Sequence, residues 1–109
     1  MAFDQTLAER IRSLLACHKN IDEKRMFGGI AFLVNGNMTI CVSKDSLIVR
    51  LGPDQSHEAV NEPHVRPLQM SGRTLKGWIR VARAGVETDE QLTGVVQRAL
   101  KFVRKLRAK

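Results

Sequence analysis

Residues 26–37 read MFGGIAFLVNGN, an apolar run with two glycines near its start and an Asn-Gly pair behind it. Asn35-Gly36 lies between two strand-like runs and predicts a tight hairpin, because both central residues of a type I′ turn need a positive φ. Gly28-Gly29 predicts a β-bulge or a close approach of two backbones rather than a phosphate-binding loop. The stretch therefore indicates antiparallel β structure with glycines in structural positions.

Further along the chain, apolar runs between turn signals predict an antiparallel sheet. The expected strands cover Met26–Val34, Met38–Val42, Leu47–Leu51, Val65–Met70 and Lys76–Val81. Connections such as Asn35-Gly36 and Ser71-Gly72 are too short to join parallel neighbours. Alternation along the last strand puts Trp78 and Arg80 on one side and a largely apolar set on the other, namely Leu75, Gly77, Ile79 and Val81.

Two helices are expected to flank the first strands. The first begins after Asp4, which can cap its first turn, and ends near Lys19-Asn20, where Asn suits a C-terminal cap. The second is short and follows Gly52-Pro53, with Asp54 as its cap and Val60 near its end.

The third helix has the clearest signals in the chain. Thr88 and Gln91 form a capping-box pattern at its start. One apolar stripe follows at helical spacing, made of Leu92, Val95, Val96, Ala99, Leu100, Val103 and Leu106. The predicted order is α-β-β-β-α-β-β-α, which is an α+β fold built as a two-layer sandwich of helices on an antiparallel sheet.

The bulk composition is that of a globular protein. Of 109 residues, 43% are hydrophobic and 27% are charged. We expect residues 1–109 to form a single domain, since domains typically have about 100–150 residues. The longest apolar run is shorter than the roughly 20 residues that a membrane-spanning helix needs, and the N-terminus lacks a signal-peptide pattern. A cytoplasmic location without membrane association is therefore expected.

The sequence has no recognisable catalytic or metal-binding pattern. Ser71 lacks a GxSxG context, and the glycine motifs of nucleotide-binding loops are missing. The candidate metal ligands have no zinc-ligand spacing; they are His18, His57, His64, Cys17 and Cys41. We expect no enzyme activity, no cofactor and no metal, with both cysteines reduced and partly buried.

The net charge is +7, and basic residues gather at the end of the chain. A positive field attracts anionic partners. The residues that could contact phosphates lie opposite the apolar stripe of the last helix; they are Arg98, Lys101, Arg104, Lys105 and Lys109. The interpretation that the sequence favours is a solvated helix end that complements the helix dipole. A helix-turn-helix signature is missing, so any nucleic-acid binding is expected to be weak and non-specific.

Trp78, the only tryptophan, is the candidate anchor for a protein partner. Tryptophan beside cations is common in binding hot spots, whereas a lone tryptophan in a small domain is often a core residue. A free edge of the sheet is a second candidate docking element. A two-fold homodimer through a sheet edge or a helix is the oligomer that we expect.

Several of these turn and packing positions together resemble the TfoX N-terminal domain family. The matching residues are Met26, Phe27, Gly28, Gly29, Asn35, Gly36, Arg50, Gly52, Pro53, Gly77 and Trp78. The resemblance implies a secretion-chaperone-like fold, with helices packed over one antiparallel sheet. It also implies a regulatory role, because TfoX (Sxy) proteins are positive regulators of bacterial competence genes that act with the cyclic-AMP receptor protein at promoters.

The full regulators carry a second, C-terminal domain, and the present sequence stops at Lys109. We therefore expect a stand-alone domain that acts as a non-enzymatic protein-interaction module in transcriptional regulation. Its partner would belong to the transcription machinery. The alternative is a low-specificity nucleic-acid-binding protein that uses its basic last helix.

Overall fold

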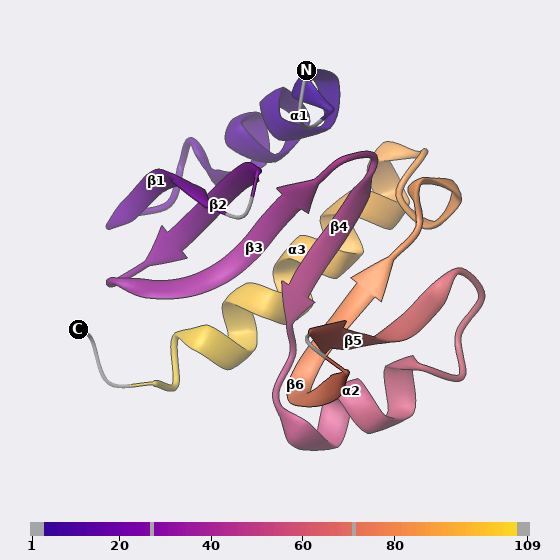
Figure 1. Ribbon diagram of the computed structural model, residues 1–109. Helices are drawn as coiled ribbons and strands as arrows, with labels where there is room; N and C mark the ends of the chain where they lie inside the picture. Colours follow the sequence, from indigo (N-terminus) through magenta and orange to yellow (C-terminus); the bar gives the residue numbers. More distant parts are fainter. Residues whose placement is uncertain (1–3, 27, 71, 107–109) are drawn as a thin grey trace.

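The computed structural model describes residues 4–26, 28–70 and 72–106 (Figure 1). In chain order its elements are α1 (Gln5–Leu15), β1 (Ile21–Met26), β2 (Gly29–Val34), β3 (Asn37–Ser43), β4 (Ser46–Arg50), α2 (Pro53–Ala59), β5 (Val65–Met70), β6 (Arg73–Val81), the 3-10 turn η1 (Arg83–Gly85) and α3 (Asp89–Val103). The expectations for Phe27, Ser71 and Lys109 lie outside the described residues.

The strands form one six-stranded antiparallel sheet with the order β1-β2-β3-β4-β6-β5. Helices α1 and α3 pack on one side of it, and in Figure 1 α3 runs behind β3 and β4. The predicted α+β architecture, helices layered on an antiparallel sheet, is confirmed. The sheet has one strand more than the sequence predicted.

The extra strand is β1, which lies before the segment predicted as the first strand and shares only Met26 with it. β1 ends at Met26, which pairs with Gly29 at the start of β2. Gly28 lies in the turn with φ +74°, and a Cβ on Gly29 would overlap the carbonyl oxygen of Val42 on β3. Gly28 therefore has the predicted positive φ, in the turn between β1 and β2, and Gly29 makes the predicted close backbone approach at the start of β2. Neither glycine lies in a bulge between β1 and β2.

The Asn-Gly hairpin between β2 and β3 is confirmed, with φ +53° at Asn35 and +81° at Gly36. The predicted alternation along β6 is wrong at Leu75, which packs on the same side of the sheet as Trp78. The physical reason is Gly77, whose φ of +89° interrupts the regular strand between these two residues.

The helix starts follow the predicted caps in two of three cases. The Asp4 carboxylate accepts a hydrogen bond from the Leu7 N–H at 3.1 Å, and both hydrogen bonds of the Thr88 capping box are present. α2 instead begins with Pro53 after Gly52 and has no side-chain cap, so the predicted role of Asp54 is wrong. Proline suits a first helical position because its φ is already helical.

The end of α1 also differs from the prediction, because the helix stops at Leu15 rather than near Asn20. Asn20 has φ +61°, and its carbonyl accepts a hydrogen bond from the Asn35 N–H at 3.0 Å. The residue predicted as a helix cap therefore leads the chain into β1.

The main core fills the space between the two helices and the sheet. Its largest fully buried side chains include Ile11, Phe32, Ile40, Leu47, Ile79 and Leu92. The predicted stripe of α3 is confirmed, since five of its members are buried: Leu92, Val96, Ala99, Leu100 and Val103. Burial of these apolar side chains is the main favourable contribution to folding.

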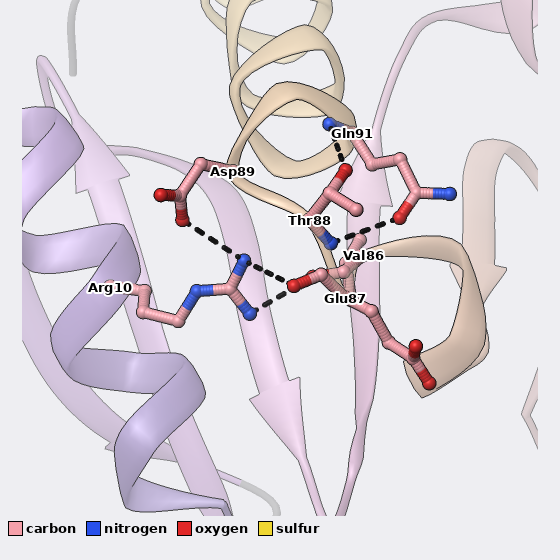
Figure 2. Close-up of polar contacts among 6 residues, drawn as sticks. All are labelled: Arg10, Val86, Glu87, Thr88, Asp89 and Gln91. Carbon is pink, nitrogen blue, oxygen red and sulfur yellow. Dashed lines mark hydrogen bonds and ion pairs between the residues drawn. The ribbon is translucent and has the colours of Figure 1, made fainter.

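Arg10 on α1 joins the two helices (Figure 2). Its guanidinium donates to the carbonyl oxygens of Val86 at 2.9 Å and Glu87 at 3.1 Å, and it reaches the Asp89 carboxylate at 3.4 Å. These three partners lie on either side of Thr88, the first residue of the capping box of α3. Arg10 therefore satisfies backbone oxygens at the entry to α3, and its position has a structural explanation.

Candidate interaction surface

A second apolar cluster lies on the sheet face opposite α1 and α3. Its buried members are Ala31, Leu33, Cys41, Ile48 and Leu68, and its partly exposed members are Met26, Met38, Leu75 and Trp78. All nine residues come from strands, and no helical residue in the described part of the chain belongs to the cluster. We call this side of the sheet the open face.

The open face also carries more basic than acidic side chains. Directly paired residues in a sheet point to the same face. The pairings of Lys24 with Ala31, Asp22 with Leu33, Arg50 with Trp78, and Ile48 with Arg80 place these charged residues there. Arg66 joins them because it pairs with Arg80. The apolar surface is thus surrounded by Lys24, Arg50, Arg66 and Arg80, with Asp22 as the acidic member.

Arg66 and Arg80 are like charges directly opposite each other on β5 and β6. Arg80 is half-buried and donates to the Ser46 hydroxyl at 2.8 Å. Burial raises the pKa of the neighbouring Cys41 thiol, and the positive charge of Arg80 opposes that shift. Neither arginine forms an ion pair with any carboxylate of residues 4–26, 28–70 and 72–106.

Arg50 lies at the end of β4, where its guanidinium meets two aromatic rings. The guanidinium carbon is 5.5 Å from the ring centroid of Trp78 and 6.0 Å from that of Phe102, distances at which cation–π attraction operates. One guanidinium nitrogen donates to the Met38 carbonyl at 3.5 Å. Within the described part of the chain Arg50 has no acidic partner either.

The backbone next to Trp78 is held by hydrogen bonds that join β6 to α2 and to the segment between β4 and α2. The Gly77 carbonyl accepts hydrogen bonds from the N–H groups of Leu51 at 2.8 Å and Gly52 at 3.1 Å. The Gly77 N–H in turn donates to the Ser56 hydroxyl of α2 at 3.2 Å. A Cβ on Gly52 would overlap the ring of Phe102. Gly52 and Gly77 are therefore structural, and together they fix the direction of the neighbouring tryptophan.

A groove of about 740 Å³ lies beside the open face, between α2 and the strands β5 and β6. Pro53, Val60 and Pro67 contribute to its walls together with Leu75 and Trp78. Because the last two residues also belong to the second cluster, the groove and the open face are continuous. Trp78, the predicted anchor, is half-buried at their junction.

The two edges of the sheet are poorly suited to pairing with another strand. β1 carries four consecutive charged residues, from Asp22 to Arg25, and β5 contains Pro67 beside an irregular register. Charged side chains and proline are the usual protection against edge-to-edge pairing. Self-association therefore stays a prediction, and its edge-based form is disfavoured.

The basic residues predicted at the last helix do not form one uniform face. Arg98 makes a two-hydrogen-bond ion pair with Glu62, at 3.2 and 3.0 Å. Lys101, Arg104 and Lys105 are exposed, and Arg104 and Lys105 follow the last residue of α3. Lys109 lies outside the described residues. The structure thus leaves a short basic segment around the end of α3, separated from Arg98.

Arg104 places this segment beside the residues that follow α1, because its guanidinium lies 3.4 Å from Nδ1 of His18.

The described residues contain no group of three or more His, Cys, Asp and Glu residues that could hold a metal ion. Cys41 is buried as predicted, but Cys17 is exposed, because it lies in the exposed segment 16–20 between α1 and β1. No described helix is both long and apolar enough to cross a membrane.

These features define a two-layer α+β domain whose antiparallel sheet has helices on one face and a second apolar cluster on the other. The chain belongs to the TfoX N-terminal domain family, whose family model matches residues 13–103. A search of curated proteins found no match.

Sequence reasoning missed the roles of Arg66 and Arg80 and treated Arg50 as a packing position. The alternation of Trp78 and Arg80 along β6 was one available signal, since it put a tryptophan and a cation on the same side. No local sequence pattern predicts that Arg66 lies opposite Arg80, because this pairing depends on the register between β5 and β6.

Proposed function

We propose that this protein is a non-enzymatic protein-interaction domain that acts in the cytoplasm, in transcriptional regulation of the competence type. Its partner would be a component of the transcription machinery. The observation that carries this proposal is the open face, where Met26, Met38, Leu75 and Trp78 are partly exposed beside arginines without carboxylate partners in the described residues.

The chemistry of this face suits a protein partner. Interface cores are enriched in aromatic residues, methionine and arginine, and depleted of lysine and acidic residues. Hydrogen bonds hold the backbone of Gly77 beside Trp78, and Arg50 lies over the Trp78 ring, so little side-chain freedom would be lost on binding. Membership of the TfoX N-terminal domain family supports the regulatory part of the proposal.

A photo-crosslinking amino acid in place of Leu75 is expected to capture a protein of the transcription machinery in living cells. The same group in place of Gln97, which is exposed on α3, is the matched control and should not capture that protein. Trp78→Ala should weaken binding of the captured partner about thirtyfold, since loss of a hot-spot tryptophan costs about 2 kcal/mol or more. RNA sequencing of cells with and without the protein then measures the regulatory effect.

Circular dichroism must show that the Trp78→Ala protein is folded before its binding is compared. The proposal fails if position 75 captures no protein of the transcription machinery. It also fails if removing the protein leaves the transcript profile unchanged.

A second candidate function is low-specificity nucleic-acid binding by the basic segment at the end of α3. The observation in its favour is the approach of Arg104 to His18, which gathers basic groups from two helix ends. Lys101 and Lys105 are exposed nearby in the sequence, and the net charge of +7 favours encounter with phosphates.

Reversal of the charges at Lys101, Lys105 and Lys109 to glutamate tests this second function. If these residues contact phosphates, each lost contact should reduce the slope of log affinity against log salt by about one unit. We expect weak binding to a DNA duplex at low salt that disappears near physiological salt. Lys44→Glu, on the β3–β4 turn, is the matched control. Tight, sequence-selective binding at physiological salt in fluorescence anisotropy would favour nucleic-acid binding over the protein-interaction function.

A further inference from the structure

We infer that the open face docks an acidic amphipathic segment of the partner protein, one whose apolar side chains lie beside aspartate and glutamate residues. The inference rests on the proposed function in taking the partner to be a protein. It goes further in naming the chemistry of the segment that binds.

Two arginines of the open face lie directly opposite each other. Arg66 and Arg80 face each other across β5 and β6, and like charges in directly opposed positions destabilise a sheet. The Ser46 hydroxyl accepts a hydrogen bond from Arg80, but a hydroxyl cannot neutralise its charge. A carboxylate placed between the two guanidinium groups would turn this repulsion into two attractive interactions. The free protein therefore presents an electrostatic mismatch that an acidic partner corrects.

The open face also has partly exposed apolar side chains. On the open face Met26 lies on β1 and Met38 on β3, whereas Leu75 and Trp78 lie on β6. Methionine is unbranched and adapts its shape to different partners, while tryptophan supplies a large rigid contact. Arg50 lies beside the Trp78 ring, so a positive charge borders the apolar surface at this end as well. A segment with both apolar and acidic side chains matches this arrangement.

Single-stranded nucleic acid is the rival occupant of a basic sheet face. Such binding depends on several aromatic side chains on which successive bases stack. Trp78 is the one aromatic member of the second cluster among the described residues, and Arg50 already lies over its ring. The partly exposed surface is otherwise aliphatic or thioether. These features favour a protein segment over nucleic acid.

The mismatch predicts opposite effects of one substitution on stability and on binding. Arg66→Glu replaces a like-charge pair with an attractive pair opposite Arg80, so the Tm of the free protein should rise. The same change removes a positive charge from the open face and adds a negative one, so an acidic segment should bind about fivefold more weakly or worse. Damage to the fold would lower both quantities, which separates it from the proposed effect.

The probe is a synthetic amphipathic helix with leucine and phenylalanine on one side and glutamate and aspartate on the other. Trp78 is the only tryptophan of the chain, so its emission reports binding at the open face directly. We expect a saturable shift of that emission with this peptide, and none with the same peptide carrying lysine in place of its acidic residues. Lys19→Glu makes the same charge change at an exposed site beyond α1 and should alter neither Tm nor binding.

A scrambled peptide of identical composition and a single-stranded DNA oligonucleotide complete the comparison. The inference is overturned if the acidic peptide causes no shift up to about 1 mM, the weakest useful affinity for such a contact. Equal binding of the lysine peptide or of the scrambled peptide overturns it too. Displacement of the acidic peptide by the oligonucleotide at lower concentration would assign the face to nucleic acid instead.

Failure of this inference and failure of the proposed function are distinguishable. The peptide experiment uses only the purified chain and does not depend on transcription. Peptide binding without any effect on transcripts would leave the acidic-segment inference standing and remove the regulatory proposal. A captured transcription protein together with no peptide binding would remove this inference alone.

Discussion

Replacing Gly29 with alanine is expected to reduce the free energy of unfolding by roughly 3 kcal/mol, the upper end of the usual cost of overpacking. The new methyl group would overlap the carbonyl oxygen of Val42, and its next nearest atoms are also backbone atoms of β3. β3 is paired with a strand on each side, so its backbone cannot move aside as the end of a flexible side chain can. Urea unfolding followed by Trp78 emission measures the loss.

Gly28→Ala is the matched control for this prediction. Gly28 has open space around its Cβ position but a φ of +74°, so alanine there meets conformational strain without a collision. That strain costs about 1–2 kcal/mol. If Gly29→Ala costs no more than Gly28→Ala, the close approach of β2 and β3 at this point is not what restricts position 29.

The elements that the sequence predicted well are those with a local signal. The positive φ angles of Asn35 and Gly36 follow from their own residue types, and the capping box at Thr88 needs only residues three apart. The apolar stripe of α3 is likewise a property of one segment. These signals do not depend on which strands become neighbours.

β1 was missed because its sequence has no strand-like pattern. Four of its six residues are charged, and its partner β2 supplies the ladder that holds it extended. Glu23 also forms an ion pair with Arg12 on α1, which donates hydrogen bonds to its carboxylate at 2.8 and 2.7 Å. This hydrogen bonding lowers the pKa of Glu23. The strand is thus a product of tertiary pairing, which residue propensity does not report.

The open face was only partly predictable for a related reason. If the pairing of Met70 with Arg73 continued without interruption, Arg66 would lie opposite Gly77. The register shifts between Pro67 and Gln69, and Arg66 lies opposite Arg80 instead. β6 also pairs with β4, which places Trp78 beside Arg50. Strand order and register are long-range properties, so Trp78 could be predicted as an anchor but its arginine neighbours could not.

A second large loss of stability is expected when a buried side chain of α3 is shortened. Leu100 is 5% exposed and belongs to the main core, where α3 packs against β3 and β4. Leu100→Ala should lower the free energy of unfolding by about 2–5 kcal/mol, because it removes apolar contacts and leaves a cavity beside the sheet. Natural domains have a total stability of only about 5–15 kcal/mol, so this change removes a large part of it.

Gln97→Ala, at an exposed position on the same helix, is the control and should change stability by less than about 0.5 kcal/mol. Both variants are compared by urea unfolding with a common m-value, since an altered m-value would indicate a changed unfolded or native ensemble. A loss of less than about 0.5 kcal/mol for Leu100→Ala would mean that the stripe of α3 does not pack on the sheet as described. Because the open face lies on the other side of the sheet, a folded Leu100→Ala protein should still bind the acidic peptide.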